Sequence, residues 1–407
     1  MTISHTSESL NSQPSSLTAK QLVTKRIKKN YYYNFILIVA ALLPVVTVGV
    51  VNWAIDPYDL FNTPNYWGIN HEKPKKDNND RSYKAADITR IKPQVIIMGS
   101  SRTKQGIDPE HPIFDNKLTT YNLAINGPNF YEVRRYIEHA IANQPDLQEI
   151  ILGVDFFMFN NNLDNQPSFD EARIGRQHII LSDVINALFS LDTLTTSIDT
   201  YQVSKQRPIT NSNYGENGFM PNRKLNNGET IWRFQQSINL YFQLHSDYQF
   251  SEQYWSDFQQ VVELCQQHDI DLKVFISPAH ATQWESIYVT ERWDTFKNWK
   301  RQLAKTLPVW DFTGYNSITT EAIAPSMNNY VDNSHYTPAI GNLILDRIYN
   351  RQSENIPSDF GILITPENIE SHLAKIDSDR TAWIANHPDE VSLVIDSKHK
   401  QDNSISP

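Results

Sequence analysis

The chain has 407 residues, of which 40% are hydrophobic, so it is long enough for one large α/β domain or two smaller ones. Its net charge of -10 argues against a nucleic-acid partner, which would require a basic face. The single cysteine, Cys265, excludes an intramolecular disulfide and a cysteine-based metal cluster, and the histidines show no metal-ligand spacing. We therefore expect no metal and no other cofactor.

The N-terminal part combines a polar tail with an apolar segment. Residues 1–24 are rich in Ser, Thr, Asn and Gln, and we expect residues 1–30 to be a disordered cytoplasmic tail. An uncharged run, 35–51, follows a basic cluster and has aromatic residues at both edges. This order predicts a transmembrane signal anchor over 31–54. A cleaved signal peptide and a buried core helix are the alternatives.

Beyond residue 90, strand patterns alternate with helix patterns. Short apolar runs predict five strands, at 94–98, 121–125, 149–154, 272–277 and 309–312. Helix patterns lie between them, and Thr337-Pro338 opens a last helix. This order predicts an α/β fold, a doubly wound parallel five-stranded sheet of flavodoxin-like type. Such sheets bind their ligands at the carboxyl ends of the strands.

The predicted extracytoplasmic domain covers 55–355 and contains a long insertion, 160–248. Within the insertion, 179–198 looks helical and 211–227 is a Gly/Asn-rich loop. The insertion is either a lid or partner surface, or an excursion without such a role. Residues 356–407 are expected to be a partly disordered C-terminal extension with one modest helix near 367–376.

Two short motifs suggest serine chemistry. Ser101 follows the first predicted strand in Gly99-Ser100-Ser101, and Asp332 precedes His335 by three positions near the end of the domain. A serine at a strand end is placed to attack a carbonyl, a histidine supplies the base, and an aspartate holds the histidine tautomer. Each motif alone also suits a tight turn or a helix cap. Their joint occurrence, in this order, favours a serine acyl-transfer site.

These blocks resemble the SGNH/GDSL hydrolase superfamily over about residues 92–350. Gly99-Ser100-Ser101 is similar to its nucleophile block, and the stretch from Asn122 to Gly127 is similar to its second block. The resemblance implies that Ser101 is the nucleophile and that the backbone N–H of Gly127 helps to form the oxyanion hole. It also implies that Asp332 and His335 complete the catalytic triad.

The third block departs from the family pattern. The family has Gly-x-Asn-Asp, whose Asn donates to the oxyanion, whereas this chain has Gly153-Val154-Asp155. An ionised aspartate only accepts hydrogen bonds and would repel a developing oxyanion. At the oxyanion position, Asp155 is therefore either protonated in an apolar site or engaged in orienting Arg102 or a substrate hydroxyl.

Arg102, Asn126 and His280 are candidate substrate-binding residues. Arg102 would bind an anionic group or the oxyanion, or instead form a salt bridge with a nearby carboxylate. His280 would bind an acceptor, or instead pack at a helix start. Four tryptophans would stack on sugars or, as is more usual, pack against the sheet: Trp284, Trp293, Trp299 and Trp310.

The Gly-Ser-Ser block and the anchor resemble a membrane-anchored branch that includes D-alanyl-lipoteichoic-acid biosynthesis and alginate O-acetylation proteins. This implies a serine acyltransferase or esterase acting on ester groups of a cell-envelope polysaccharide or related polymer. It would lie in the bacterial inner membrane, mostly periplasmic, with a carbohydrate acyl acceptor and a membrane-bound O-acyltransferase as partners. The alternatives are a non-catalytic accessory protein of a surface-polymer acylation or export complex, and a small-molecule esterase.

Overall fold

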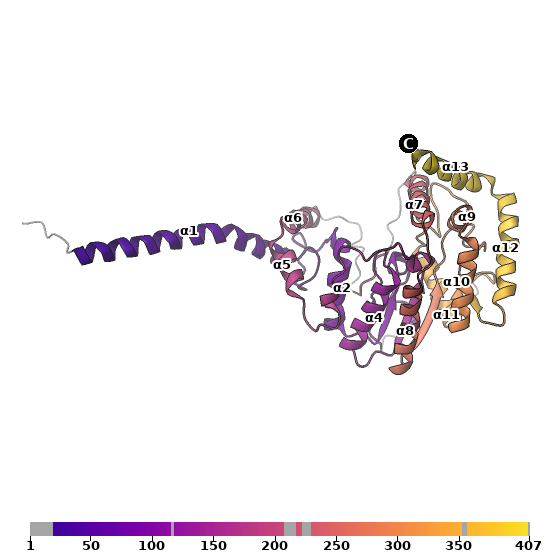
Figure 1. Ribbon diagram of the computed structural model, residues 1–407, viewed down its shortest axis with the longest axis horizontal. Coiled ribbons are helices and arrows are strands. Elements are labelled where there is room, and N and C mark those ends of the chain that lie inside the picture. Colours follow the sequence, from indigo (N-terminus) through magenta and orange to yellow (C-terminus); the bar gives the residue numbers. More distant parts are fainter. Residues whose placement is uncertain (1–18, 115–117, 207–216, 222–228, 352–355, 406–407) are drawn as a thin grey trace, which may run out of the picture.

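A computed structural model describes residues 19–114, 118–206, 217–221, 229–351 and 356–405 (Figure 1). The strands are β1 Val95–Met98, β2 Thr120–Asn122, β3 Glu149–Val154, β4 Asp271–Ile276, β5 Val309–Asp311 and β6 Ile362–Ile364. The helices of the first half are α1 Ala19–Ile55, α2 Asp80–Ile91, α3 Ser101–Gly106, α4 Phe130–Asn143, α5 Leu181–Phe189 and α6 Leu191–Lys205. Those of the second half are α7 Glu229–Ser246, α8 Glu252–Gln267, α9 Ala281–Val289, α10 Trp293–Thr306, α11 Pro338–Ile348, α12 Ile369–Asn386 and α13 Pro388–Ile405.

The predicted α/β class is confirmed, but the sheet is mostly rather than entirely parallel and has six strands rather than five. Its order is β2-β1-β3-β4-β5-β6, with the first five strands parallel and β6 antiparallel to β5. The sequence pattern misses β6 because this edge strand has only three residues, two of which are exposed. A half-exposed strand of that length shows too little alternation to be recognised.

Helices cover both faces of the sheet. Successive side chains of β1 alternate between the faces, so that Val95 and Ile97 belong to one buried cluster and Ile96 and Met98 to the other. Residues of α4, α8, α10 and α12 pack in the cluster of Ile96, and residues of α11 pack in the cluster of Val95. Burial on both faces explains why these strands read as continuous apolar runs.

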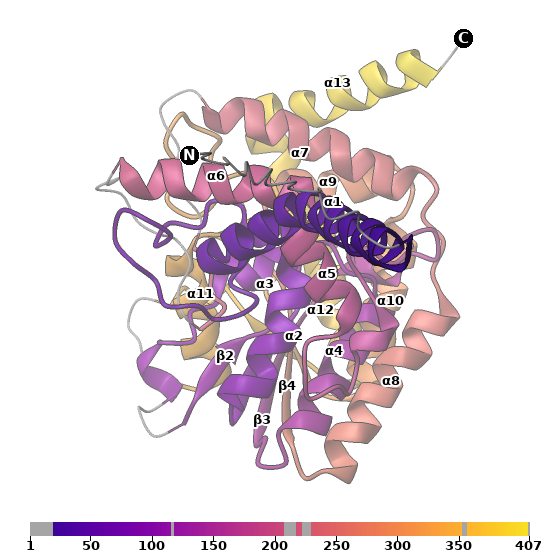
Figure 2. The same ribbon diagram turned by 90° about the vertical axis from the view of Figure 1, so that its left-hand side faces the viewer.

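Helix α1 is the one helix of the described residues that is long and apolar enough to cross a membrane. It projects from the domain in Figure 1, and Figure 2 looks along it toward α5 and α6. It begins at Ala19 rather than at residue 31, because the lysines and arginine after Ala19 favour helix. The rest of the expected tail, residues 1–18, lies outside the described residues.

The insertion and the C-terminal extension contain more helix than predicted. The expected helix of 179–198 is two helices, because Ser190 is extended and caps α6 by accepting from Asp192 N at 3.1 Å. Most of the predicted loop at 211–227 lies outside the described residues. After β6, the extension forms two helices where one was expected. Val394 of α13 packs with Ile238 and Phe242 of α7, and this long-range contact is not visible as a local pattern.

Candidate active site

A tight connection after β1 places Ser101 at the carboxyl edge of the sheet. Gly99 has a φ of 155°, and a Cβ there would lie 2.8 Å from the carbonyl oxygen of Gly153. A glycine is therefore required for this close approach of β1 and β3. Ser100 caps α3 by accepting a hydrogen bond from Arg102 N at 3.2 Å, so Ser101 is the first residue of the helix.

The structure brings Ser101, His335 and Asp332 together. Ser101 Oγ lies 2.8 Å from His335 Nε2, and His335 Nδ1 lies 2.8 Å from Asp332 Oδ2. The imidazole side chain is 22% exposed, so the site can be reached from solvent. If Nδ1 donates to the carboxylate, Nε2 carries the lone pair that accepts the Ser101 hydroxyl proton. This is the arrangement of a Ser–His–Asp triad.

Asp332 is held in its ionised form. Burial raises its pKa, but the neighbouring His335 and two backbone donors outweigh burial and lower it below the usual value. The donors are Ser334 N at 2.7 Å and His335 N at 2.8 Å, both bound to Asp332 Oδ1. The second carboxylate oxygen is thus left for His335, which fixes the orientation of the ring.

Gly127 lies in the loop that follows β2, the strand beside β1. Ile125 N donates to Gly99 O at 3.1 Å, so the chain after β2 runs beside the chain after β1. Gly127 has a φ of 49°, and no described residue accepts a hydrogen bond from its backbone N–H. Ser101 has no intrahelical acceptor for its own N–H, because it is the first residue of α3. Both N–H groups therefore meet one requirement of an oxyanion donor, namely that no backbone acceptor among the described residues engages them.

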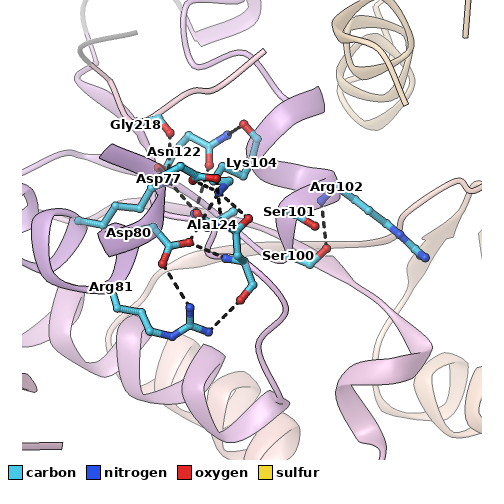
Figure 3. A network of polar contacts seen from close by, with 12 residues as sticks. Asp77, Asp80, Arg81, Ser100, Ser101, Arg102, Lys104, Asn122, Ala124 and Gly218 are labelled. Atoms are coloured by element: carbon cyan, nitrogen blue, oxygen red, sulfur yellow. Dashed lines mark hydrogen bonds and ion pairs between the residues drawn. The ribbon is translucent and has the colours of Figure 1, made fainter. Parts of the chain in front are cut away.

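Asn126 is engaged within the protein rather than free for substrate. Its side chain accepts from Lys104 Nζ at 2.5 Å and donates to Asp77 at 3.0 Å. Its backbone N–H donates to Asp80, and its carbonyl accepts from Arg81 at 2.9 Å. Figure 3 shows this network beside Ser101, with Lys104 buried in it. The expected substrate-binding role is thus replaced by a structural one, which fixes the turn that carries Gly127.

Asp155 is not a hydrogen-bond donor to the site. Its Oδ2 accepts from Ser100 Oγ at 2.6 Å, and its Oδ1 accepts from Arg102 Nη1 at 2.8 Å. Both side chains of the ion pair are buried. Asp155 therefore does not have the expected oxyanion role, because a carboxylate whose two oxygens accept hydrogen bonds has no N–H or O–H to donate to an oxyanion. Orientation of Arg102, one of the alternatives, is what the structure shows.

Arg102 is likewise committed to internal partners instead of a substrate. Besides Asp155, it donates to Ser334 Oγ at 2.9 Å, to Tyr241 at 2.9 Å and to Gln283 at 2.7 Å. Burial lowers its pKa, but Asp155 and Tyr241 outweigh burial and raise it above the usual value. The sequence does not reveal the three neutral partners, because they come from three separate segments without a common motif.

His280 is also structural, as its second interpretation proposed. It caps α9 by accepting from Thr282 N at 3.2 Å, and its Nε2 lies 2.7 Å from the carbonyl of Glu321. Burial lowers its pKa to about 4, so the ring is neutral near pH 7 and donates from Nε2. Its backbone N–H donates to Asn333 O at 3.1 Å, which fixes the loop that carries Asp332.

The four tryptophans pack in or against the core. Trp284, Trp293 and Trp299 are buried in the cluster of Ile96, and Trp310 is partly buried against the cluster of Val95. A cavity of about 660 Å³ lies between the end of β5 and α12, and one of about 430 Å³ lies beside α5 and α6. Neither is lined by a triad residue. Among the described residues, no group of three or more metal-ligating side chains is gathered to hold an ion.

Comparison with known proteins adds no relative. No protein-family model, no curated protein and no solved structure matches the chain.

Proposed function

We propose that the chain is a membrane-anchored serine acyltransferase or esterase of SGNH type, acting on ester groups of a cell-envelope polysaccharide or related polymer. The observation that carries this proposal is the pair of 2.8 Å contacts joining Ser101, His335 and Asp332. Ser101 is more than two hundred residues away in the sequence from the Asp332–His335 pair. Their assembly at the carboxyl edge of the sheet supports a shared chemical role.

In the proposed mechanism, Ser101 Oγ attacks the ester carbonyl carbon while His335 Nε2 takes the hydroxyl proton. The ester oxygen becomes an oxyanion facing the N–H groups of Ser101 and Gly127. His335 then gives its proton to the leaving alcohol oxygen, and the acyl group remains on Ser101. An acceptor hydroxyl or a water repeats these steps in reverse, which yields transfer or hydrolysis.

The setting of the site supports a polymer as substrate. Ser101 is partly exposed, and the His335 side chain is 22% exposed. One ester group of a long chain would reach a nucleophile that is open to solvent in this way. Helix α1 would anchor the domain in the bacterial inner membrane with its bulk in the periplasm. A membrane-bound O-acyltransferase would supply the acyl group there.

A second function is favoured by Asp155. Removal of one oxyanion donor typically costs roughly 100- to 1000-fold in rate, and Asp155 stands where the resembled family has its third donor. With both oxygens engaged by Ser100 and Arg102, this carboxylate does not replace that donor. The alternative is therefore a non-catalytic accessory or binding protein of a surface-polymer acylation or export complex.

Acylation by an activated ester tests the proposal. The full chain in detergent is mixed with p-nitrophenyl acetate, and peptide mass analysis locates any acetyl group. We expect acetyl on Ser101 and a matching burst of nitrophenol, with both absent from Ser101→Ala. The control variant Ser256→Ala changes a serine on α8 and should behave as wild type. Acetylation that is equal in Ser101→Ala, or absent from folded wild type, would favour the accessory role.

A further inference from the structure

Helix α6 buries polar residues and exposes large apolar ones. A surface helix normally turns its apolar side toward the protein and its polar side toward water. The side of α6 that is buried against the domain consists of hydroxyl residues: Thr193, Thr196, Ser197, Thr200 and Ser204. Among its exposed residues are Leu191, 71% exposed, Ile198 and Tyr201. The other exposed residues of α6 are polar: Asp192, Thr195, Gln202 and Lys205. This arrangement is unfavourable in water.

Helix α5 repeats the pattern. Leu181, Ile185 and Phe189 follow one another at four-residue spacing, which places them on one side of the helix, and all three are exposed. The opposite side buries Asp183, whose carboxylate pairs with Arg173 at 2.8 Å. The outer sides of the two helices form what we call the α5–α6 apolar face: Leu181, Ile185, Phe189, Leu191, Ile198 and Tyr201.

Both helices are fixed to the end of α1, as Figures 1 and 2 show. A Cβ on Gly49 of α1 would lie 2.7 Å from the ring of Phe189, so the two helices touch there. Asn52 is fully buried; its side chain donates to the carbonyl of Leu188 at 2.9 Å and accepts from Ser197 Oγ at 2.9 Å. These contacts fix the position of the α5–α6 apolar face along the axis of α1, beside residues 49–52.

If α1 spans the bilayer, this position along α1 corresponds to the edge of the hydrocarbon core. The uncharged run 35–51 rises about 25 Å as a helix, at about 1.5 Å per residue. A bilayer has a hydrocarbon core of about 30 Å, so the whole run is needed to cross it. Gly49 lies near the end of the run. Phe189, which packs against Gly49, is therefore at the boundary between hydrocarbon and headgroups.

Aromatic residues mark the same level. Trp53 of α1 and Trp67 are 54% and 74% exposed. The loop that carries Trp67 is attached to the end of α1, because Asn70 donates to the carbonyl of Ala54 at 3.3 Å. Exposed tryptophans are typical of the membrane–water interface, where the ring contacts lipid and the N–H remains hydrated.

We propose that the α5–α6 apolar face lies in the interfacial zone of the bilayer that α1 spans, as a second membrane contact of the domain. The inference rests on the proposed membrane anchoring of α1. Apolar area drives this contact, since Lys205 is the only basic residue of α5 and α6. Neutral phosphatidylcholine is thus a sufficient lipid, and added salt should not weaken the contact. Two membrane contacts would fix the orientation of the domain relative to the bilayer, whereas α1 alone could tilt within the bilayer and carry the domain with it.

Site-directed fluorescence in lipid vesicles tests the proposal. Leu191→Cys and Ile198→Cys are labelled with the environment-sensitive fluorophore NBD, and the full chain is reconstituted in dioleoylphosphatidylcholine vesicles. Cys265 is left in place, because it is buried and burial raises the pKa of its thiol to about 12. Leu240→Cys is the matched control, an exposed leucine of α7. Val46→Cys, within α1, reports whether the anchor itself is in lipid.

We expect doxyl-labelled lipid to quench NBD at Leu191 and Ile198, and iodide to quench it there several-fold less than at Leu240. If lipid quenches NBD at Val46 but iodide quenches Leu191 and Ile198 as strongly as Leu240, the second membrane contact is wrong. The membrane anchoring of α1 would still be supported. Protection at Leu191 and Ile198 from both quenchers would overturn the second membrane contact in favour of contact with a second copy of the chain. No lipid quenching even at Val46 would overturn the anchoring, and this inference with it.

Discussion

Arg102 Nε donates to Ser334 Oγ at 2.9 Å, which joins the residue after the candidate nucleophile to the residue before His335. Ser101 thus belongs to a helix that is tied by a buried side chain to the loop carrying its base. The same guanidinium pairs with Asp155 at the end of β3. One buried cation therefore holds three segments of the site in register.

The buried ion pair should show strong energetic coupling. Arg102→Met leaves the Asp155 carboxylate buried without its cation, and Asp155→Asn leaves the cation without its carboxylate. Removal of one partner of such a pair typically costs about 3 to 5 kcal/mol. Denaturant unfolding of the full chain in detergent should show that the double variant loses less than the sum of the single variants. Additive losses would mean that the two side chains do not stabilise each other.

His335→Gln should remove nearly as much acyl transfer as Ser101→Ala, because the two residues act as one unit. Asp332→Asn should cost on the order of 10⁴-fold in turnover, since the amide no longer holds the reactive tautomer. Each rate is measured as release of nitrophenol from p-nitrophenyl acetate, with the melting temperature as the check on folding. Wild-type rates in His335→Gln would show that the assigned base is wrong.

The sequence predicts the sheet well because its strands are buried on both faces. Continuous apolar runs mark β1, β3 and β4 within about a residue of their observed ends. Serine, histidine and aspartate are likewise recognisable, because their chemistry limits the residue types that can serve and their motifs are local. Asp332 and His335 are only three positions apart, so the hydrogen bond between them is a short-range feature.

The partners of Arg102 could not be predicted in the same way. Tyr241 comes from the insertion and Gln283 from α9, and nothing in their local sequence distinguishes them from other polar residues. The same holds for the long C-terminal helices, whose stability depends on packing against distant elements. The partners of Arg102 and the C-terminal helices depend on tertiary contacts, which a single sequence does not reveal.

Stability should fall with acidification below pH 6.5 through His280. Its pKa is lowered to about 4 in the folded protein, against 6.5 for an ordinary histidine. The unfolded chain therefore binds a proton first, and the stability contributed by the neutral ring is present above pH 6.5 and lost between 6.5 and 4. The difference corresponds to about 3 kcal/mol.

His280→Asn isolates this contribution, because asparagine keeps an acceptor for the cap of α9 but does not titrate in this range. The free energy of unfolding, measured from pH 8 to pH 4, should fall less steeply in the variant than in wild type. Parallel curves for the two proteins would show that the buried ring does not resist protonation.

The nucleophilicity of Ser101 is measured most directly by the intact mass of the full chain after exposure to a fluorophosphonate, with Ser101→Ala treated in parallel. An activated Ser101 displaces fluoride and retains the phosphonyl group. We expect one adduct on wild type and none on the variant. Well-folded wild type without an adduct, or an equal adduct on Ser101→Ala, would contradict a nucleophilic Ser101.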